Sequence, residues 1–168
     1  TPPDTRASFF MSNPSVLRLK VVLVLLVLLG MGPAPALRFE EVRRFPSPYA
    51  NQGVAVDAGH FYAITNQAIG KHDKETGELV DEWIGAPDGP IVHLNSGIVL
   101  EGRLYATHSN YPGVPMVSSI EIWDVETMEH VGSHSFGIFQ GSATWADRHD
   151  GSWWVAFANY EGVGGQAG

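Results

Sequence analysis

Short apolar runs separated by turn residues dominate the chain after residue 36, and none of them continues at the spacing of a helix. Runs of four to eight residues bounded by Gly, Pro, Asn and Asp are typical of strands. The pattern predicts a first series of strands at 53–57, 60–65, 68–73 and 78–84. A second series follows at 97–100, 103–108, 119–124 and 130–136.

The two series can be aligned with each other strand by strand. Gly53-Val-Ala-Val-Asp, a turn and Phe61-Tyr-Ala correspond to Gly97-Ile-Val-Leu-Glu, a turn and Leu104-Tyr-Ala. A third series opens with Ser142-Ala-Thr-Trp-Ala and continues, after a turn, with Trp153-Trp-Val-Ala. Between the third and fourth strands, Asp73-x-x-Thr76 recurs as Asp124-x-x-Thr127, and Asp in this position accepts hydrogen bonds from the turn backbone.

A repeat of about 40–50 residues with four strands per unit is typical of propeller blades. We therefore predict an all-β fold for residues 37–168, an incomplete β-propeller of about two and a half four-stranded antiparallel blades. The fragment would belong to a longer protein, because propellers need about four to eight blades. Aromatic residues are expected to fill the space between blades: Phe61, Trp83, Tyr105, Trp123, Trp145, Trp153 and Trp154.

The segment 39–45, Phe-Glu-Glu-Val-Arg-Arg-Phe, has the pattern of a fourth strand without the rest of its blade. In closed propellers such a strand completes the last blade, which removes the sheet edges. We expect it to pair with nothing in the first blade.

The Asp73 to Gly77 hairpin and the repeated Val-Ala-Val-Asp and Leu-Tyr-Ala strands resemble the blades of the quinoprotein-like, YVTN-type and lactonase-like β-propellers. The resemblance covers about residues 37–160 and rests on motifs of the fold. It implies a propeller, and by analogy with some exported members it allows a cyclase-like activity.

The N-terminal region has the layout of a secretory signal peptide at 11–36, preceded by upstream or fragment-boundary residues 1–10. Two cations, Arg18 and Lys20, precede the apolar run 21–29, and Ala34-Pro-Ala36 offers a cleavage site. A membrane anchor would need about 20 apolar residues, more than this run supplies. The sequence predicts a secreted or periplasmic protein that begins at Leu37.

Charge excludes two classes of partner. Without residues 1–36 the chain keeps seven cations and seventeen acids, a formal charge of −10. Nucleic-acid binding needs a cationic surface, and anionic bilayers would repel this one, so we expect neither nucleic acid nor a membrane as a partner. The chain has no Cys, which excludes disulfides and a lipid-modified cysteine.

Candidate binding residues are predicted at one end of the strands, because every second turn of an antiparallel meander lies on the same side. The connections between units supply Gln52, His93 and Asn95, and the hairpins between second and third strands supply Asn66, His108, Asn110, Tyr111, Asn159 and Tyr160. The turns around Thr76, Thr127 and His149 should lie away from them. Each Asn has an alternative role, since Asn suits turns that need the left-handed conformation.

His93 and His108 are the candidate catalytic residues, because neutral imidazole can act as a base or ligate Zn, Fe or Cu. Solvated or hydrogen-bonded histidines without chemistry remain the alternative. The other histidines are interpreted as surface residues: His60, His72, His130, His134 and His149. The loop 109–118 is expected to form a rim that presents Tyr111 and Met116.

Two functions follow. The first is a propeller that binds a small molecule or a protein partner through this neutral, amide- and aromatic-rich face. The second is a metal-assisted, lactonase-like or cyclase-like enzyme, in which Asn95, Asn110, Asn159 and Glu161 hold Ca²⁺, or imidazole holds a transition metal. The sequence names no substrate, and it has no Gly-x-Ser-x-Gly elbow or phosphate-binding loop.

Overall fold

The computed structural model describes residues 37–138 and 140–160, and divides the chain into two units, Thr1–Arg43 and Arg44–Gly168. The described part of the first unit, residues 37–43, has no regular secondary structure. The predicted signal peptide and Glu161 lie outside the described residues.

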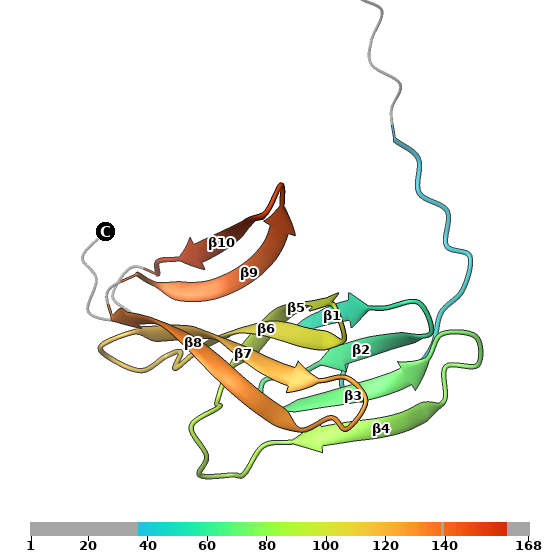
Figure 1. Cartoon of the computed structure of the whole chain (residues 1–168), viewed down its shortest axis with the longest axis horizontal. Helices are drawn as coiled ribbons and strands as arrows, with labels where there is room; N and C mark the ends of the chain where they lie inside the picture. Colours follow the sequence, from blue (N-terminus) through green and yellow to red (C-terminus); the bar gives the residue numbers. More distant parts are fainter. Residues whose placement is uncertain (1–36, 139, 161–168) are drawn as a thin grey trace, which may run out of the picture. The chain divides into compact units, whose positions relative to one another are not determined.

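Ten antiparallel strands in three sheets form the second unit, in the chain order seen in Figure 1. Sheet 1 has the order β1-β2-β3-β4 and sheet 2 has the order β5-β6-β7-β8. The third sheet is a hairpin of β9 and β10. Their bounds are β1 Gly53–Val56, β2 His60–Ile64, β3 Ala68–Asp73, β4 Leu79–Ile84, β5 Leu94–Leu100, β6 Arg103–Ser109, β7 Val117–Asp124, β8 His130–Ile138, β9 Ser142–His149 and β10 Ser152–Ala158.

The predicted all-β fold and the ten strands predicted in the three series are confirmed, with ends that differ by a few residues. No helix occurs in residues 37–138 and 140–160. Accordingly, the described chain contains no helix long and apolar enough to cross a membrane.

The repeated Asp-x-x-Thr turns fold alike in both four-stranded sheets. Asp73 Oδ1 accepts the backbone N–H groups of Glu75 and Thr76 at 2.9 and 2.8 Å. Asp124 Oδ1 accepts the equivalent N–H groups of Glu126 and Thr127 at 2.8 and 3.1 Å. The next residue is left-handed in both turns: it is Gly77 (φ 78°) in the first and Met128 (φ 52°) in the second. Met128 accepts this conformation with a side chain that is buried in the core.

Sheets 1 and 2 pack face to face and share one hydrophobic core. Sheet 1 contributes Tyr62, Ile64 and Ile69, all fully buried, and sheet 2 contributes Leu104 and Trp123, also fully buried. The Trp83 ring meets the Trp123 ring edge-on at 5.0 Å between centroids. Truncating a buried Trp to Ala typically costs about 3–5 kcal/mol, so Trp123 alone is a large part of this interface.

The first strands of the two sheets approach closely, and this explains the glycine at position 53. A Cβ atom on Gly53 would lie 2.7 Å from the Asn95 carbonyl oxygen and 2.9 Å from the Ser96 Cα atom. Both are backbone atoms, which cannot move aside as a flexible side chain can. Glycine at the start of β1 is therefore required for β1 to lie against β5.

Polar side chains also join neighbouring sheets. Lys71 Nζ, on sheet 1, donates to the Val125 carbonyl of sheet 2 at 2.7 Å. Between sheet 2 and the hairpin, Ser118 Oγ donates to the Gly141 carbonyl at 2.6 Å and accepts the Ala143 N–H at 2.9 Å. Such directed bonds fix how each sheet is placed against the next.

The expected strand at 39–45 is not formed, since residues 37–47 contain no strand. This agrees with the expectation that the segment does not join sheet 1, whose order begins at β1. Phe45 packs instead as a side chain, with its ring stacked on that of Phe61 at 5.8 Å. The backbone ladder that defines a strand needs a neighbouring strand, whereas Phe45 contacts sheet 1 through its side chain.

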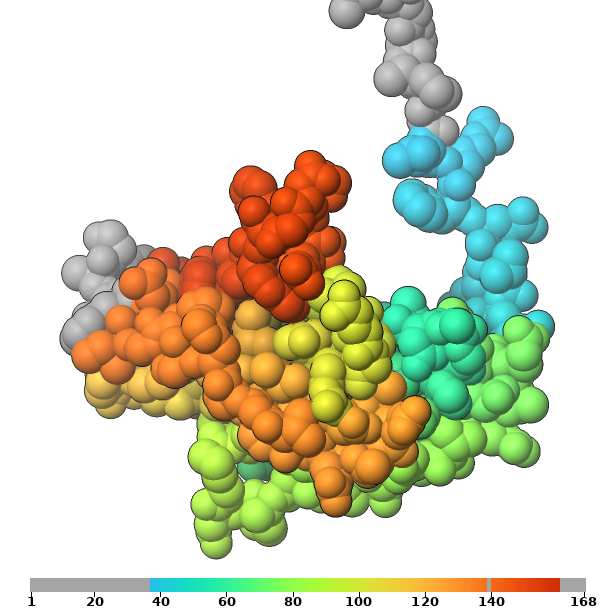
Figure 2. Space-filling view, in the orientation of Figure 1, coloured from blue at the N-terminus to red at the C-terminus, as the bar shows by residue number. Residues whose placement is uncertain are grey.

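The expectation that aromatic rings fill the space between sheets holds for Trp123 and for Trp153, whose ring lies 5.1 Å from that of Tyr105, but all three tryptophans of the hairpin keep large exposed areas. Trp145, Trp153 and Trp154 are 46%, 39% and 60% exposed. On the face drawn in Figure 2, the side chains of β9 and β10 stand out as a ridge on the rest of the unit. A two-stranded sheet covers only part of its neighbour, so these rings are left in solvent in the part of the chain that the structure describes.

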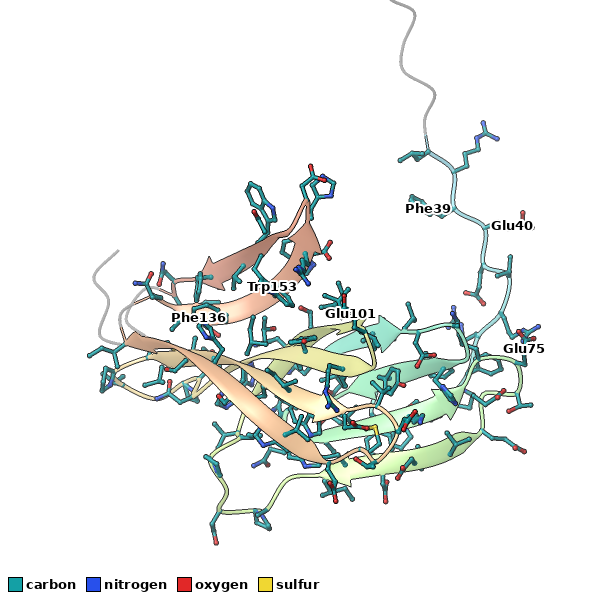
Figure 3. All side chains as sticks on the ribbon, in the orientation of Figure 1. Phe39, Glu40, Glu75, Glu101, Phe136 and Trp153 are labelled. Atoms are coloured by element: carbon teal, nitrogen blue, oxygen red, sulfur yellow. The ribbon has the colours of Figure 1, made fainter. Side chains whose placement is uncertain are left out.

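An apolar pocket of about 350 Å³ lies between sheet 2 and the hairpin. Figure 3 shows Phe136 of β8 and Trp153 of β10 facing it from its two sides. The remaining lining residues are Tyr105, Ile120, Ile122, His134 and Val155.

We predict that this chain self-associates through the exposed β10 strand and that Trp154→Lys reduces the association. A charge on an exposed edge strand opposes pairing with another chain, and Trp154 contributes little to the core because it is mostly exposed. Light scattering over a range of concentrations would measure the effect.

His149→Lys is the matched control, because it adds a charge to the same hairpin at its end rather than along the strand edge. Equal association of wild type and Trp154→Lys would show that β10 is not the contact.

Candidate functional site

The predicted site residues lie at one end of the sheets. The backbone joins them: Leu94 N–H donates to the Asn66 carbonyl at 2.9 Å, and Ser109 N–H donates to the His93 carbonyl at 3.0 Å. Figure 1 shows this end on the left, with the β6–β7 loop and the ends of β8 and β10. The turns that contain Thr76, Thr127 and His149 lie at the other end of their strands, as the alternation of strand direction predicts.

Three rings from three connections form a row at this end. The centroids of His93 and Tyr111 are 5.3 Å apart, and those of Tyr111 and Tyr160 are also 5.3 Å apart. His93 precedes β5, Tyr111 lies in the β6–β7 loop, and Tyr160 follows β10. Offset rings at this spacing present a continuous, partly exposed aromatic surface.

His93 is held as neutral imidazole. Burial lowers its pKa below the ordinary 6.5, while a hydrogen bond with the Asn95 side chain acts in the opposite direction. A neutral ring beside two phenol rings suits a neutral ligand better than a strongly charged one. Asn95 is itself fixed, because its Nδ2 donates to the Ala143 carbonyl at 2.9 Å.

The amide side chains differ in what they leave open to a ligand. Gln52 Nε2 donates to Asn66 Oδ1 at 2.6 Å, and both residues are exposed at the surface. Asn159 is also exposed, beside Gly141, where a Cβ atom would come within 2.5 Å of Asn159 Oδ1. These three amides are accessible.

Asn110, in contrast, holds its own loop together. Its Oδ1 accepts the Val117 N–H at 2.7 Å and its Nδ2 donates to the Pro115 carbonyl at 3.0 Å. Asn110 therefore has the structural role considered as an alternative to ligand binding. It stabilises the loop through side-chain hydrogen bonds, and its backbone is not left-handed. Met116, in the same loop, is buried at 2% exposure, so the expectation that the rim presents it is wrong.

His108 lies next to this row and is buried, with 6% exposure. Its Nε2 accepts the Val92 N–H at 3.2 Å, which requires an unprotonated nitrogen there. Its Nδ1 then carries the proton and donates to Ser119 Oγ at 2.9 Å. Burial lowers the pKa of His108. The charge of nearby Glu121 raises this pKa, and the charge of nearby His93 lowers it further, so the net shift is downward. Both ring nitrogens of His108 thus have hydrogen-bond partners within the protein. The catalytic role of His93 and His108 stays a prediction, and it depends on His93.

The hydrogen-bond chain continues from His108 to a carboxylate that the sequence reasoning missed. Ser119 Oγ donates to Glu121 Oε1 at 2.5 Å, and Ser133 Oγ donates to the same oxygen at 2.8 Å. His130 Nε2 donates to Glu121 Oε2 at 2.7 Å. Glu121 is only 6% exposed. Burial raises its pKa, but the three hydrogen bonds outweigh burial and leave the pKa below the ordinary 4.5.

A signal for Glu121 was present in the strand pattern. Alternate residues of a strand share a face, so Ser119, Glu121 and Trp123 must point the same way. A carboxylate between a serine and the most buried tryptophan of the core breaks the expected pattern of an apolar face. Buried acids need partners, and this one has them on β6, β7 and β8.

Two histidines predicted to be surface residues have structural roles. His72 is 3% exposed, and its ring nitrogens contact Ser47 Oγ at 3.0 Å and the Gly77 carbonyl at 3.1 Å. The prediction for His72 is wrong because residues 45–49 fold over this face of β3. His130 is partly exposed but its Nε2 is fixed by Glu121, whereas His134 and His149 are exposed as predicted. His60 is half-buried beside Asp57.

Within the described residues, no group of three or more His, Cys, Asp or Glu side chains could hold a metal ion. Of the oxygen ligands considered for Ca²⁺, Asn110 is engaged in its loop and Asn95 bridges to β9, while Glu161 lies outside the described residues.

Comparison with known proteins gives no family. No protein-family model matches the chain, and no curated protein matches it. Among solved structures, the chain is similar to the crystal structure of the computationally designed Ika4 protein at 13% sequence identity. The match covers 73% of this chain and 100% of that one, with a TM-score of 0.37.

We predict that acid weakens the fold in two steps. The pKa of His108 is lower in the folded chain than in the unfolded chain, so its contribution is complete above pH 6.5 and is lost as the pH falls from there. The pKa of Glu121 is also lowered, so a second loss begins below pH 4.5. Urea unfolding at pH 7.5 and pH 5.5 should therefore give a lower free energy of unfolding at pH 5.5.

His108→Gln should be less stable at both pH values but should show a smaller difference between them. His149→Gln is the control, because His149 is 77% exposed in its side chain and should leave the difference unchanged. An undiminished pH difference in His108→Gln would contradict the assignment.

Proposed function

We propose that this chain is part of an exported β-propeller that binds a small molecule or a protein partner at the end of its sheets. The observation that carries the proposal is the row of His93, Tyr111 and Tyr160 rings, flanked by the accessible amides of Gln52, Asn66 and Asn159. Ligand sites commonly combine apolar rings with a few polar groups that fix orientation.

Three features of the fold support a propeller. The two four-stranded sheets follow each other in the chain with the same strand order and the same Asp-x-x-Thr turns. The first strand of sheet 1 lies against the first strand of sheet 2, and the absence of a Cβ atom on Gly53 allows this close approach. Propellers place successive first strands side by side around a central channel.

In a propeller, the hairpin of β9 and β10 would be the first half of a third blade. A third repeat like the first two would add two strands beside β10. These strands would cover the apolar pocket between sheet 2 and the hairpin, and with it the exposed Trp153 and Trp154 rings. We propose that the full-length protein contains these strands.

The rings and amides favour a ligand without strong charge. Amide groups donate and accept hydrogen bonds without carrying charge, and His93 is held neutral. Because the rings come from three different connections, a ligand that lies across them would contact the connection before sheet 2, the β6–β7 loop and the end of β10 together.

We predict that Tyr111→Ala weakens ligand binding strongly, because Tyr111 is the middle ring of the row. A library of neutral small molecules would be screened by ligand-observed NMR against the natural full-length protein. Hits should lose about tenfold or more in affinity with Tyr111→Ala, since stacked aromatic contacts and their buried area contribute strongly to binding.

Trp154→Ala is the control, because it removes an exposed ring away from the row. Hits that bind Tyr111→Ala as well as wild type would contradict the proposed site. Turnover of a hit that disappears with His93→Ala would replace a binding function with a catalytic one.

The export proposal has its own test. The secreted protein should begin at Leu37, because cleavage is expected after Ala36. N-terminal sequencing of the extracellular or periplasmic product measures this directly. A mature product that retains residues 11–36 would contradict the signal peptide.

A further inference from the structure

A second pocket, of about 420 Å³, lies between sheets 1 and 2, and its lining shares no residue with the row of rings. It is bounded by Trp83 at the end of β4, by the connection that follows β4, and by side chains of β7 and β8. Its lining residues are Trp83, Gly85, Ala86, Gly89, Pro90, Ile91, Glu121, His130 and Ser133. The ligand proposed above would not occupy this pocket.

The pocket has one charged group at its base, the Glu121 carboxylate. The side chain is only 8% exposed, yet it lines the pocket, so its small open area faces this space. Both serine hydroxyls that contact Glu121 donate to Oε1. Oε2 accepts His130 Nε2, and a carboxylate oxygen has a second lone pair for another donor.

None of the side chains that contact Glu121 carries a permanent positive charge that would balance its carboxylate. Two of its partners are hydroxyl groups, which carry no charge. His108 is neutral, since its Nε2 accepts a backbone N–H. His130 is charged only when it is protonated. A buried carboxylate without a permanent cation attracts one from outside.

The walls of the pocket suit an organic cation better than a metal ion. Trp83 lies on one side, and Pro90 and Ile91 lie on another. Behind them the Trp83 and Trp123 rings, and the Trp123 and His130 rings, meet at 5.0 Å each. Aromatic rings attract organic cations, and apolar walls bind a hydrocarbon group. One carboxylate is too few oxygen ligands for Ca²⁺ or Mg²⁺.

From this arrangement we infer that the pocket binds a small organic ammonium ion with an apolar substituent. Its N–H groups donate to Glu121 Oε2 and its substituent lies against Trp83, Pro90 and Ile91. The acidic chain, with a formal charge of −8, favours the approach of such a cation.

Benzylammonium is the probe, and benzyl alcohol is the neutral control with the same ring and nearly the same shape. Titration of this chain would be followed by Trp fluorescence and by ligand-observed NMR. We expect saturable binding of benzylammonium and binding of benzyl alcohol that is about tenfold weaker or absent, since charge-assisted hydrogen bonds are stronger than neutral ones.

Three variants locate the site. Glu121→Gln keeps the shape and should weaken benzylammonium binding about tenfold or more, because it removes the charge. Ala86→Trp should block the pocket at an exposed position without touching the carboxylate. His130→Gln keeps a hydrogen-bond donor near Glu121 Oε2, so benzylammonium should still bind.

Tyr111→Ala should leave benzylammonium binding unchanged, which separates this inference from the proposed function. The inference is overturned if benzylammonium does not bind saturably, if benzyl alcohol binds equally well, or if Ala86→Trp has no effect. In those cases Glu121 serves only to hold β6, β7 and β8 together.

Discussion

The face-to-face packing of sheet 1 on sheet 2 is the interaction on which the rest of the structure depends. A single four-stranded sheet has no interior, so its apolar residues are buried only when another sheet covers them. Tyr62, Ile69, Leu104 and Trp123 become fully buried in this way. The same packing brings together the connections at one end of the two sheets, and these supply His93 and Tyr111, while the hairpin adds Tyr160.

The interface is not wholly apolar, and its polar part explains why the two candidate histidines differ. His108 is at the start of a hydrogen-bond chain that runs through Ser119 to Glu121. Moving a carboxylate out of water is costly, and three hydrogen bonds offset that cost here. His93 lies outside this series of hydrogen bonds, and its ring contacts that of Tyr111. One histidine is therefore part of the interior and the other is part of a surface.

The third sheet, the hairpin of β9 and β10, shows how apolar side chains stay exposed when too few strands cover them. Ser118 and Asn95 hold β9 against sheet 2 through backbone groups of Gly141 and Ala143. These bonds fix the position of the hairpin, but two strands cannot bury three tryptophans. The contrast between Trp123, which has no exposed surface, and Trp154, which is 60% exposed, measures the difference between a covered and an uncovered sheet face.

The sequence by itself determined the ten strands, their division into repeats, the Asp-x-x-Thr turns and the end of the sheets where the site residues lie. These features are local: alternation of apolar residues, turn chemistry and strand direction need no knowledge of distant contacts. Only the tertiary structure decided which side chains are buried and which are paired. His72 is covered by residues 45–49, Asn110 spans its own loop, and Glu121 finds partners on three strands. Burial and hydrogen bonding depend on what packs over a residue, and residues far away in the chain supply that cover.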